Sequence, residues 1–353
     1  MLARLRSSSL SLAAVALGLL IGAVLVAIQG KNPWTAASAI YHGSMDGTQP
    51  IGRTLDKASP LICTGLAVMV ALKAGLFNIG AQGQVVTGAI VSGYVGYAVK
   101  VPAPFAVVIA IVFGSLAATL PALLAGVLKA TRGVHEVIST IMLNTVVFGL
   151  AEWLSGPRGP WKKPRAGFPR TPDIRTQANI PHVHHLPISF LIAVAAVIVV
   201  WVLLGRTTIG FRLATVGANR HAAHYAGISV ASTVILAMAI SGGLAGLAGS
   251  IQSLGVVGYY TNGSATGLGF DGITIALLAR IKPTAAIPAA VFIGAMRASN
   301  TALQSEAKIA PEIIDVVVAV ILLLVAAPVL VRAILRLKGD AGGELRLTSG
   351  WGA

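Results

Sequence analysis

Charged side chains are scarce in this sequence, and acidic side chains are the scarcest of them. Among 353 residues there are 11 Asp and Glu against 26 Lys and Arg, and charged residues make up only 10% of the chain. Soluble domains typically contain about 25% charged residues, so the composition argues against a soluble domain. The formal net charge of +15 falls between apolar runs, which is typical of residues that orient membrane spans and not of a nucleic-acid site.

The sequence also has few of the groups that enzymes rely on. Its single cysteine, Cys63, lies in an apolar run and is interpreted as a small core residue that forms no internal disulfide. The nucleotide-binding pattern Gly-x-x-x-x-Gly-Lys-Ser/Thr does not occur, which excludes ATP hydrolysis by that route. The hydrolase patterns His-Glu-x-x-His and Gly-x-Ser-x-Gly do not occur either. His182, His184 and His185 have no acidic or cysteine neighbour to complete a site, so no metal is expected.

Apolar runs dominate what is present, since 56% of the residues are hydrophobic. Runs near 20 residues recur without the period-two alternation of a barrel, and the length suffices for about ten helical spans. We therefore predict an all-α polytopic membrane protein. The expected spans cover about 10–29, 60–73, 85–99, 105–128, 132–154, 187–205, 230–254, 270–280, 284–300 and 313–331.

Ten crossings place both termini in the cytoplasm. Residues 30–59 and the 155–186 segment then lie outside, and the 206–229 segment lies inside. Lys and Arg elsewhere favour the inner side, with Arg332, Arg336 and Lys338 closing the last span, but six basic residues fall in the outer 155–186 loop. A loop of this length should follow the positive-inside rule, so this loop is the part of the topology that the charges oppose.

Polar residues interrupt the apolar pattern at two places. The Gly75–Gln84 segment reads Gly-Leu-Phe-Asn-Ile-Gly-Ala-Gln-Gly-Gln, which indicates either a broken helix beside a polar path or a short, closely packed loop. Glu136, Thr140 and Asn144 are spaced by four, so a helix places them on one face. In a membrane that face must meet protein or water, either as a path for solute or as hydrogen bonds between helices.

Local signals predict two further features. Asn219 is a good N-cap for a short helix, and Gly227 is a good stop. Gly242, Gly246 and Gly249 are spaced by about one turn, which predicts a face for close packing against a neighbouring helix.

Four stretches together resemble the permease subunits of bacterial ABC importers for nucleosides and simple sugars, in the branched-chain amino acid/ribose-type permease superfamily. They are Gly75–Gln84, Gly133–Asn144, Thr208–Gly227 and Gly269–Arg280. The resemblance extends over about residues 60–330. It implies a type II ABC importer permease fold in one transmembrane domain, residues 1–353, in the cytoplasmic membrane of a bacterium.

The resemblance also implies partners. These are a cytoplasmic ABC ATPase that carries the ATP and Mg²⁺, a second permease subunit, identical or homologous, and an extracellular substrate-binding lipoprotein. No cofactor is then expected on this chain, which would be a transporter subunit and not an enzyme. The residues that match the ATPase-coupling region are Gly217, Ala218, Asn219, Ala222, Ala223 and Gly227.

We expect six polar residues to line or support the substrate pathway, because amides both donate and accept hydrogen bonds and so suit a neutral, hydroxyl-rich solute. They are Asn78, Gln82, Gln84, Glu136, Asn144 and Asp271. Departures from the family pattern leave the choice between nucleoside and sugar open. They are His135, His221, Thr274 and the 279–283 stretch.

An ion-coupled secondary carrier for a small polar solute is the alternative function. Such carriers usually place acidic residues inside the membrane to couple ion and solute movement. Few of the 11 acidic residues fall in the expected spans, which argues against this class.

Overall fold

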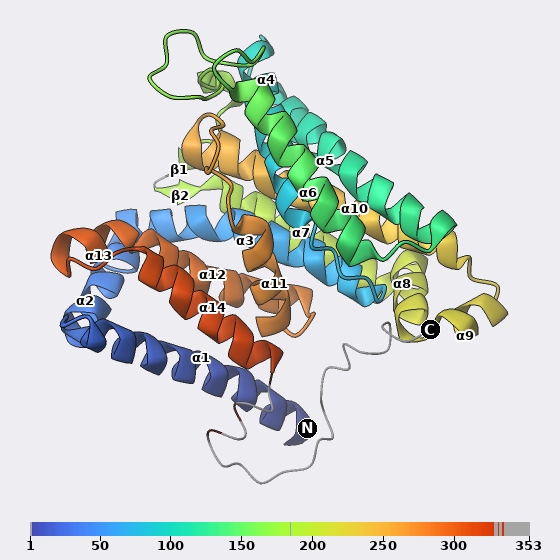
Figure 1. Cartoon of the computed structure of the whole chain (residues 1–353), viewed down its shortest axis with the longest axis horizontal. Helices are drawn as coiled ribbons and strands as arrows, with labels where there is room; N and C mark the ends of the chain where they lie inside the picture. The colour runs from blue at the N-terminus through green and yellow to red at the C-terminus, as the bar shows by residue number, and fades with distance from the viewer. Residues whose placement is uncertain (1, 184, 328–330, 332–333, 335–353) are drawn as a thin grey trace.

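The computed structural model describes residues 2–183, 185–327, 331 and 334, with side chains from residue 13 onward. Helices account for nearly all of its regular structure, as the sequence predicts, and its two short strands form one hairpin (Figure 1). The elements are α1 Leu2–Ile28, α2 Pro33–Ser44, α3 Thr48–Lys73, α4 Ala81–Ala98, α5 Phe105–Arg132, α6 Glu136–Ser155, β1 His182–Val183, β2 Leu186–Pro187, α7 Ile188–Arg206, α8 Thr208–Ala218, α9 Arg220–Tyr225, α10 Val230–Ile251, α11 Leu268–Leu278, α12 Ala286–Ala298, α13 Asn300–Glu306 and α14 Glu312–Ala326.

Helix α10 packs closely against α4 and α5 through small residues. A Cβ added to Gly242 would lie 2.5 Å from Ala122 Cβ, and one added to Gly246 would lie 2.5 Å from Ala118 Cβ. On the α4 side, a Cβ on Gly249 would lie 2.0 Å from the Val85 carbonyl oxygen. The predicted close-packing face is confirmed, because each glycine allows a backbone approach that any side chain would block. A π-helical turn, Gln252–Val257, then extends α10.

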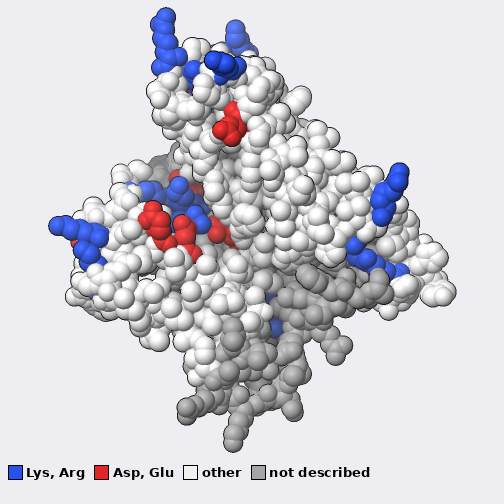
Figure 2. All heavy atoms as spheres, viewed as in Figure 1, with Lys and Arg blue, Asp and Glu red and all other residues white. Residues whose placement is uncertain are grey.

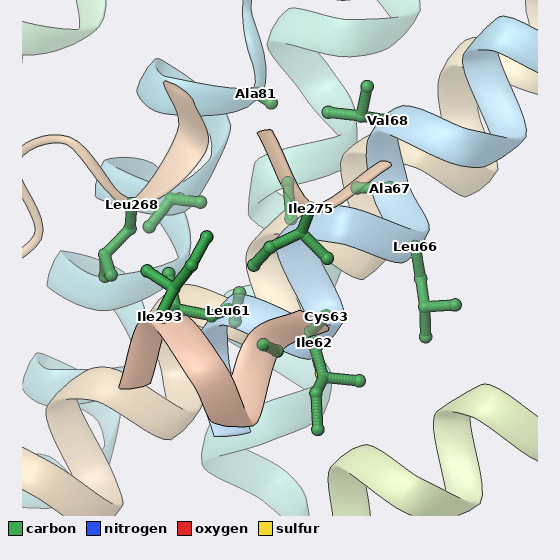
Figure 3. Close-up of a cluster of buried hydrophobic side chains, with 14 of the residues drawn as sticks. Leu61, Ile62, Cys63, Leu66, Ala67, Val68, Ala81, Leu268, Ile275 and Ile293 are labelled. Atoms are coloured by element: carbon green, nitrogen blue, oxygen red, sulfur yellow. The ribbon is translucent and has the colours of Figure 1, made fainter. Parts of the chain in front are cut away.

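Helix α3 joins this group to α11, α12 and α7. Its middle is completely buried, and Figure 3 shows Leu61, Ile62 and Leu66 among the side chains of this core, together with Ile275 of α11 and Ile293 of α12. Helix α14 packs on α1 at the edge of the molecule (Figure 1). The described structure therefore has one continuous apolar core centred on α3 and α10.

Five helices are long and apolar enough to cross a membrane, namely α3, α5, α6, α7 and the 28-residue stretch Val230–Val257 that includes α10. A sixth crossing is possible if Leu268–Leu278 and Pro283–Glu306, bent by 118°, form one broken span. The structure is thus that of a polytopic all-α membrane protein. The expected count of about ten is not established, because the other expected spans coincide with helices that do not meet this length and composition. The tail with Arg332, Arg336 and Lys338 lies outside the described residues.

One boundary prediction is wrong. The second span was expected to begin near residue 60, but α2 occupies part of the preceding 30–59 segment and α3 begins at Thr48, with Pro60 in its interior. Tertiary contacts stabilise this polar first half of α3. Thr54 Oγ1 donates to the Ser44 carbonyl at 2.8 Å, and Asp56 pairs with His182 at 2.9 Å. A local hydropathy pattern contains neither contact.

The 155–186 segment is folded against the rest of the chain. The Trp161 ring stacks on Tyr94 of α4 with centroids 4.3 Å apart, and the Arg170 guanidinium lies over the Tyr259 ring at 4.4 Å. Asp173 pairs with both Lys163 and Arg170. Part of the basic charge of this loop is therefore engaged in internal contacts. Of the histidines near its end, His182 pairs with Asp56, and His184 lies outside the described residues.

Candidate functional site

The Gly75–Gln84 segment forms the turn between α3 and α4 and the first turn of α4, and its polar side chains are buried. Asn78 Nδ2 donates to Gln84 Oε1 and to Ser241 Oγ of α10, both at 2.9 Å. Gln84 Nε2 donates back to Asn78 Oδ1 at 3.2 Å. Ser241 Oγ in turn donates to the Ala67 carbonyl of α3 at 2.7 Å. These contacts tie α3, α4 and α10 together at one point.

The same segment is joined to α6 and α11. Gly83 N donates to Asn144 Oδ1 at 2.9 Å, and Asn144 Nδ2 donates to the Ile79 carbonyl at 3.1 Å. Gln82 Nε2 donates to the Ala265 carbonyl, and Gln82 Oε1 accepts from Gly269 N at 2.8 Å. We call Asn78, Gln82, Gln84, Asn144 and Ser241 the amide network.

Glycines in this segment allow the network to form. A Cβ on Gly83 would lie 2.6 Å from Asn144 Oδ1, and one on Gly80 would lie 2.9 Å from Thr140 Cβ. Gly75 has a φ of +69°, which favours glycine. Of the two readings of the segment, the structure therefore shows the closely packed turn.

The polar stripe on α6 faces the protein interior. Glu136, Thr140 and Asn144 are all at least 94% buried, and Glu136 Oε2 lies 2.9 Å from Lys129 Nζ at the end of α5. The stripe therefore joins α6 to two other helices. The ion pair of Glu136 connects α6 to α5, and the hydrogen bond of Asn144 connects α6 to α4. The predicted pathway residues Asn78, Gln82, Gln84 and Asn144 already have hydrogen-bond partners within the chain.

The 206–229 segment forms two short helices at one end of the molecule (Figure 1). Asn219 caps α9 by accepting from Ala222 N at 3.0 Å, and Gly227 ends the segment with a φ of +75°. Both local predictions are confirmed. Tyr225 is 90% exposed, whereas Ala223 is completely buried. The outward face of α9 therefore presents Ala222 and Tyr225, while Ala223 packs inward.

The end of α8 contacts the beginning of the Gly75–Gln84 segment, backbone against backbone. A Cβ added to Gly217 would lie 2.3 Å from the Lys73 carbonyl oxygen and 2.9 Å from Gly75 N. A Cβ on Gly75 would lie 3.2 Å from Gly217 Cα. We call this contact the glycine joint. It connects the exposed α8–α9 region directly to the turn that carries the amide network.

Asp271 lies in the first turn of α11 and is only 7% exposed. Its carboxylate oxygen Oδ2 lies 2.7 Å from Nη2 of Arg297, which belongs to the last turn of α12. The same Nη2 donates to Asp315 Oδ1 of α14 at 3.2 Å. Sequence reasoning selected Asp271 but missed Arg297 and Asp315. The available signal was a lone arginine in an apolar run, which requires an acidic partner inside a membrane.

No metal centre is evident in the part of the chain that the structure describes, where no group of three His, Cys, Asp or Glu side chains is placed to hold an ion. The site therefore consists of a buried amide network, a charged cluster beside it and an exposed helical region joined to it by glycines. Such an arrangement positions helices and can pass movement between them. It contains no evident nucleophile with an adjacent base.

Comparison with known proteins gives a consistent result. The model of a family described as branched-chain amino acid transport system permease component matches residues 51–326. A guanosine ABC transporter permease, NupP of Bacillus subtilis, is 32% identical over 95% of this chain and 97% of its own length. NupB, a nucleoside ABC transporter permease of Lactococcus lactis, is 31% identical over 92% of each chain. TsgB13, a glucose ABC transporter permease of Haloferax volcanii, is 30% identical over 88% of this chain and 84% of its own. No solved structure gives a significant match.

Proposed function

The chain belongs to the family of branched-chain amino acid transport system permease components, and we propose that it is the membrane-spanning subunit of an ATP-driven importer of nucleosides or simple sugars. Family membership and the relatives' names support this class of protein. ATP hydrolysis would belong to a partner, since the sequence has no nucleotide-binding loop of its own.

The glycine joint is the structural observation that carries the proposed mechanism. We infer that a cytoplasmic ATPase docks on α8 and α9, whose outward face carries Phe211 at 66% exposure and Tyr225 at 90%. Large exposed aromatic side chains favour a protein interface. Because Gly217 touches Lys73 and Gly75, a rigid movement of α8 would displace the turn that holds the amide network. Closing and opening of the ATPase would then switch access to the pathway between the two sides.

The complete assembly would include a second permease subunit and an extracellular lipoprotein that delivers the solute. In this arrangement the 206–229 segment is cytoplasmic, the 155–186 loop is extracellular, and α1, α4, α11, α12 and α14 complete the expected ten spans of a type II importer. The amide network and the α6 stripe support the pathway. The only ATP and Mg²⁺ would be bound by the ATPase.

Nucleosides are the first choice of substrate and simple sugars the second. Two of the three relatives compared above are named for guanosine or nucleosides, and the third for glucose. Both classes are neutral and rich in hydroxyl groups. Amide side chains can serve such solutes without charge repulsion.

Affinity purification from native membranes tests the docking surface. We expect the Tyr225→Ala variant to lose most of the co-purifying ATPase, because it removes a large exposed contact from α9. Tyr41→Ala is the matched control, since Tyr41 is also an exposed tyrosine, at 56%, but belongs to α2 at the opposite side of the molecule (Figure 1). Equal ATPase recovery with both variants would contradict docking at α9.

Uptake measurements in the same cells separate the proposed importer from an ion-coupled carrier. Uptake of guanosine or glucose should require the ATPase and should survive ionophores that collapse ion gradients. Uptake that persists after deletion of the ATPase and fails with ionophores would instead support the secondary carrier.

A further inference from the structure

The proposed coupling mechanism makes no use of the charges at Asp271, Arg297 and Asp315, which we call the Arg297 cluster. The cluster brings together three helix ends: the first turns of α11 and α14 and the last turn of α12. The two aspartates lie at helix N-termini and the arginine at a helix C-terminus, which are the positions where the helix dipole favours each sign of charge. Helix ends therefore explain why the charges gather, but they do not explain the unused hydrogen-bonding capacity of the cluster.

Among the described residues, one buried donor of this cluster has no hydrogen-bond partner, and one buried acceptor has only its ion-pair partner. They are Arg297 Nε and Asp271 Oδ2. Asp271 Oδ2 is paired with Arg297 Nη2 at 2.7 Å, and the same nitrogen also donates to Asp315. A buried donor or acceptor without a partner is costly, and the cost is higher for charged groups. The cluster is therefore left with one free donor, Arg297 Nε, beside a carboxylate whose oxygens can accept further hydrogen bonds.

The cluster can be reached from the surface. The side chain of Asp315 is 64% exposed and that of Arg297 is 22% exposed. Figure 2 shows acidic and basic side chains side by side in a hollow on the left of the viewed face. Gly267, with a φ of +83°, lies so close that a Cβ there would be 3.9 Å from Arg297 Nη2. The absence of a side chain at this position keeps the approach to the guanidinium open.

The cluster also adjoins the amide network. Asp271 lies two residues after Gly269, whose N–H donates a hydrogen bond to Gln82 Oε1 at 2.8 Å. Arg297 stands next to α13, on the side of the molecule away from α8 and α9 (Figure 1). In the proposed topology this is the side from which the solute arrives.

We propose that the Arg297 cluster binds vicinal hydroxyl groups of the transported solute, an inference that rests on the proposed importer function. The Asp271 carboxylate accepts from the hydroxyl hydrogens, and Arg297 Nε donates to a hydroxyl oxygen. Asp315 is a positioning residue that holds the guanidinium through Nη2. Two carboxylates and one guanidinium carry a net charge of about −1, so the cluster disfavours phosphorylated solutes and selects neutral ones. The ribose of a nucleoside and the ring of glucose both present vicinal hydroxyls.

Uptake of matched substrates by the complete transporter tests this site. Guanosine and 2′-deoxyguanosine form one pair, and glucose and 3-deoxyglucose form a second. The wild type should prefer the full diol about tenfold, the effect of losing one hydrogen bond to a charged group. The preference should fall toward one in Asp271→Asn and in Arg297→Lys, because lysine keeps the charge but lacks Nε and the planar fork. Glu306→Gln is the control, since Glu306 belongs to a separate ion pair with His42.

The outcomes separate the site from the function on which it rests. An unchanged diol preference in both variants, with normal membrane abundance, would overturn the site while leaving the importer intact. Equal uptake of diol and deoxy substrates by the wild type would do the same. If the wild type takes up no member of either pair, the substrate assignment fails and the site with it. If Asp271→Asn does not fold, the diol preference of Arg297→Lys still tests the site. This variant should fold, because lysine keeps a positive charge beside both carboxylates.

Discussion

At the scale of single residues, close packing of the helices depends on glycines, which have no side chain. Gly88 of α4 meets Gly246 of α10 so closely that a Cβ on Gly88 would lie 2.4 Å from the Gly246 carbonyl oxygen. Apolar association gives little driving force between helices inside a bilayer, so close packing and hydrogen bonding contribute more of the stability. Asn78, in the turn that leads into α4, complements this contact by donating a hydrogen bond to Ser241 of α10.

Gly88→Ala should therefore destabilise the protein. The added methyl would clash with the backbone of Gly246, which cannot easily move aside. Overpacking of this kind typically lowers the free energy of unfolding by about 1–3 kcal/mol. Thermal unfolding of the detergent-purified protein measures the effect. Gly149→Ala is the matched control, because a Cβ at Gly149 of α6 meets nothing within 4 Å. An equal melting temperature for both variants would contradict the close α4–α10 contact.

At the scale of elements, the 155–186 loop shows how a polar segment can be ordered with only one short helical turn, the 3₁₀ turn Thr176–Ala178, among its described residues. The Thr171 N–H donates to the Tyr260 carbonyl at 2.9 Å, and the Trp161 ring stacks on Tyr94. The pKa of Asp173 is lowered, chiefly by the hydrogen bond from Lys163, and the Arg170 charge adds to this effect. The ionised carboxylate is thus the form that stabilises the loop.

Asp173→Asn should loosen this loop at neutral pH, because two basic side chains lose their common acceptor. In the wild type the depressed pKa means that the contribution is fully present above the unfolded value, about 3.9. It is lost as the pH falls through the lower folded pKa. Hydrogen–deuterium exchange over residues 157–175, corrected for the intrinsic rate at each pH, should show both effects. Asp46→Asn, outside this cluster, should leave the exchange of the loop unchanged.

At the scale of the whole molecule, α8 and α9 lie at one side, and the hairpin and α13 lie at the other (Figure 1). The glycine joint leads from the exposed helices to α3 and α4, and the amide network leads on to α6, α10 and α11. A continuous series of packed elements therefore connects the proposed ATPase surface with the Arg297 cluster. Contacts of this kind allow a movement at one end to be felt at the other.

Gly217→Ala should separate binding of the ATPase from transport. A methyl at 217 would lie 2.3 Å from the Lys73 carbonyl oxygen, so α8 must move away from the turn, while the outward face of α9 stays intact. We expect the ATPase to co-purify normally and uptake to fall at least tenfold. Gly205→Ala, where a Cβ meets nothing within 4 Å, should retain uptake. Full uptake by Gly217→Ala would show that coupling does not depend on this contact.

The sequence by itself determined the class of protein and several local features. Long apolar runs predicted a helical membrane protein, because an unpaired backbone cannot lie in lipid. The cap at Asn219, the stop at Gly227 and the close-packing glycines of α10 were also predicted correctly, since each depends on a few neighbouring residues. Four motifs were enough to predict the family to which the chain belongs.

Only the tertiary structure decided how the polar residues are used. Asn78 meets Ser241, which is 163 residues away in the sequence, and Gln82 accepts from Gly269, 187 residues away. No periodicity can predict such pairs, because they depend on which helices become neighbours. For the same reason the sequence missed Arg297, the inward position of Ala223 and the start of α3 at Thr48. An apolar run shows that a segment is buried in lipid or protein, but the choice between the two is made by packing.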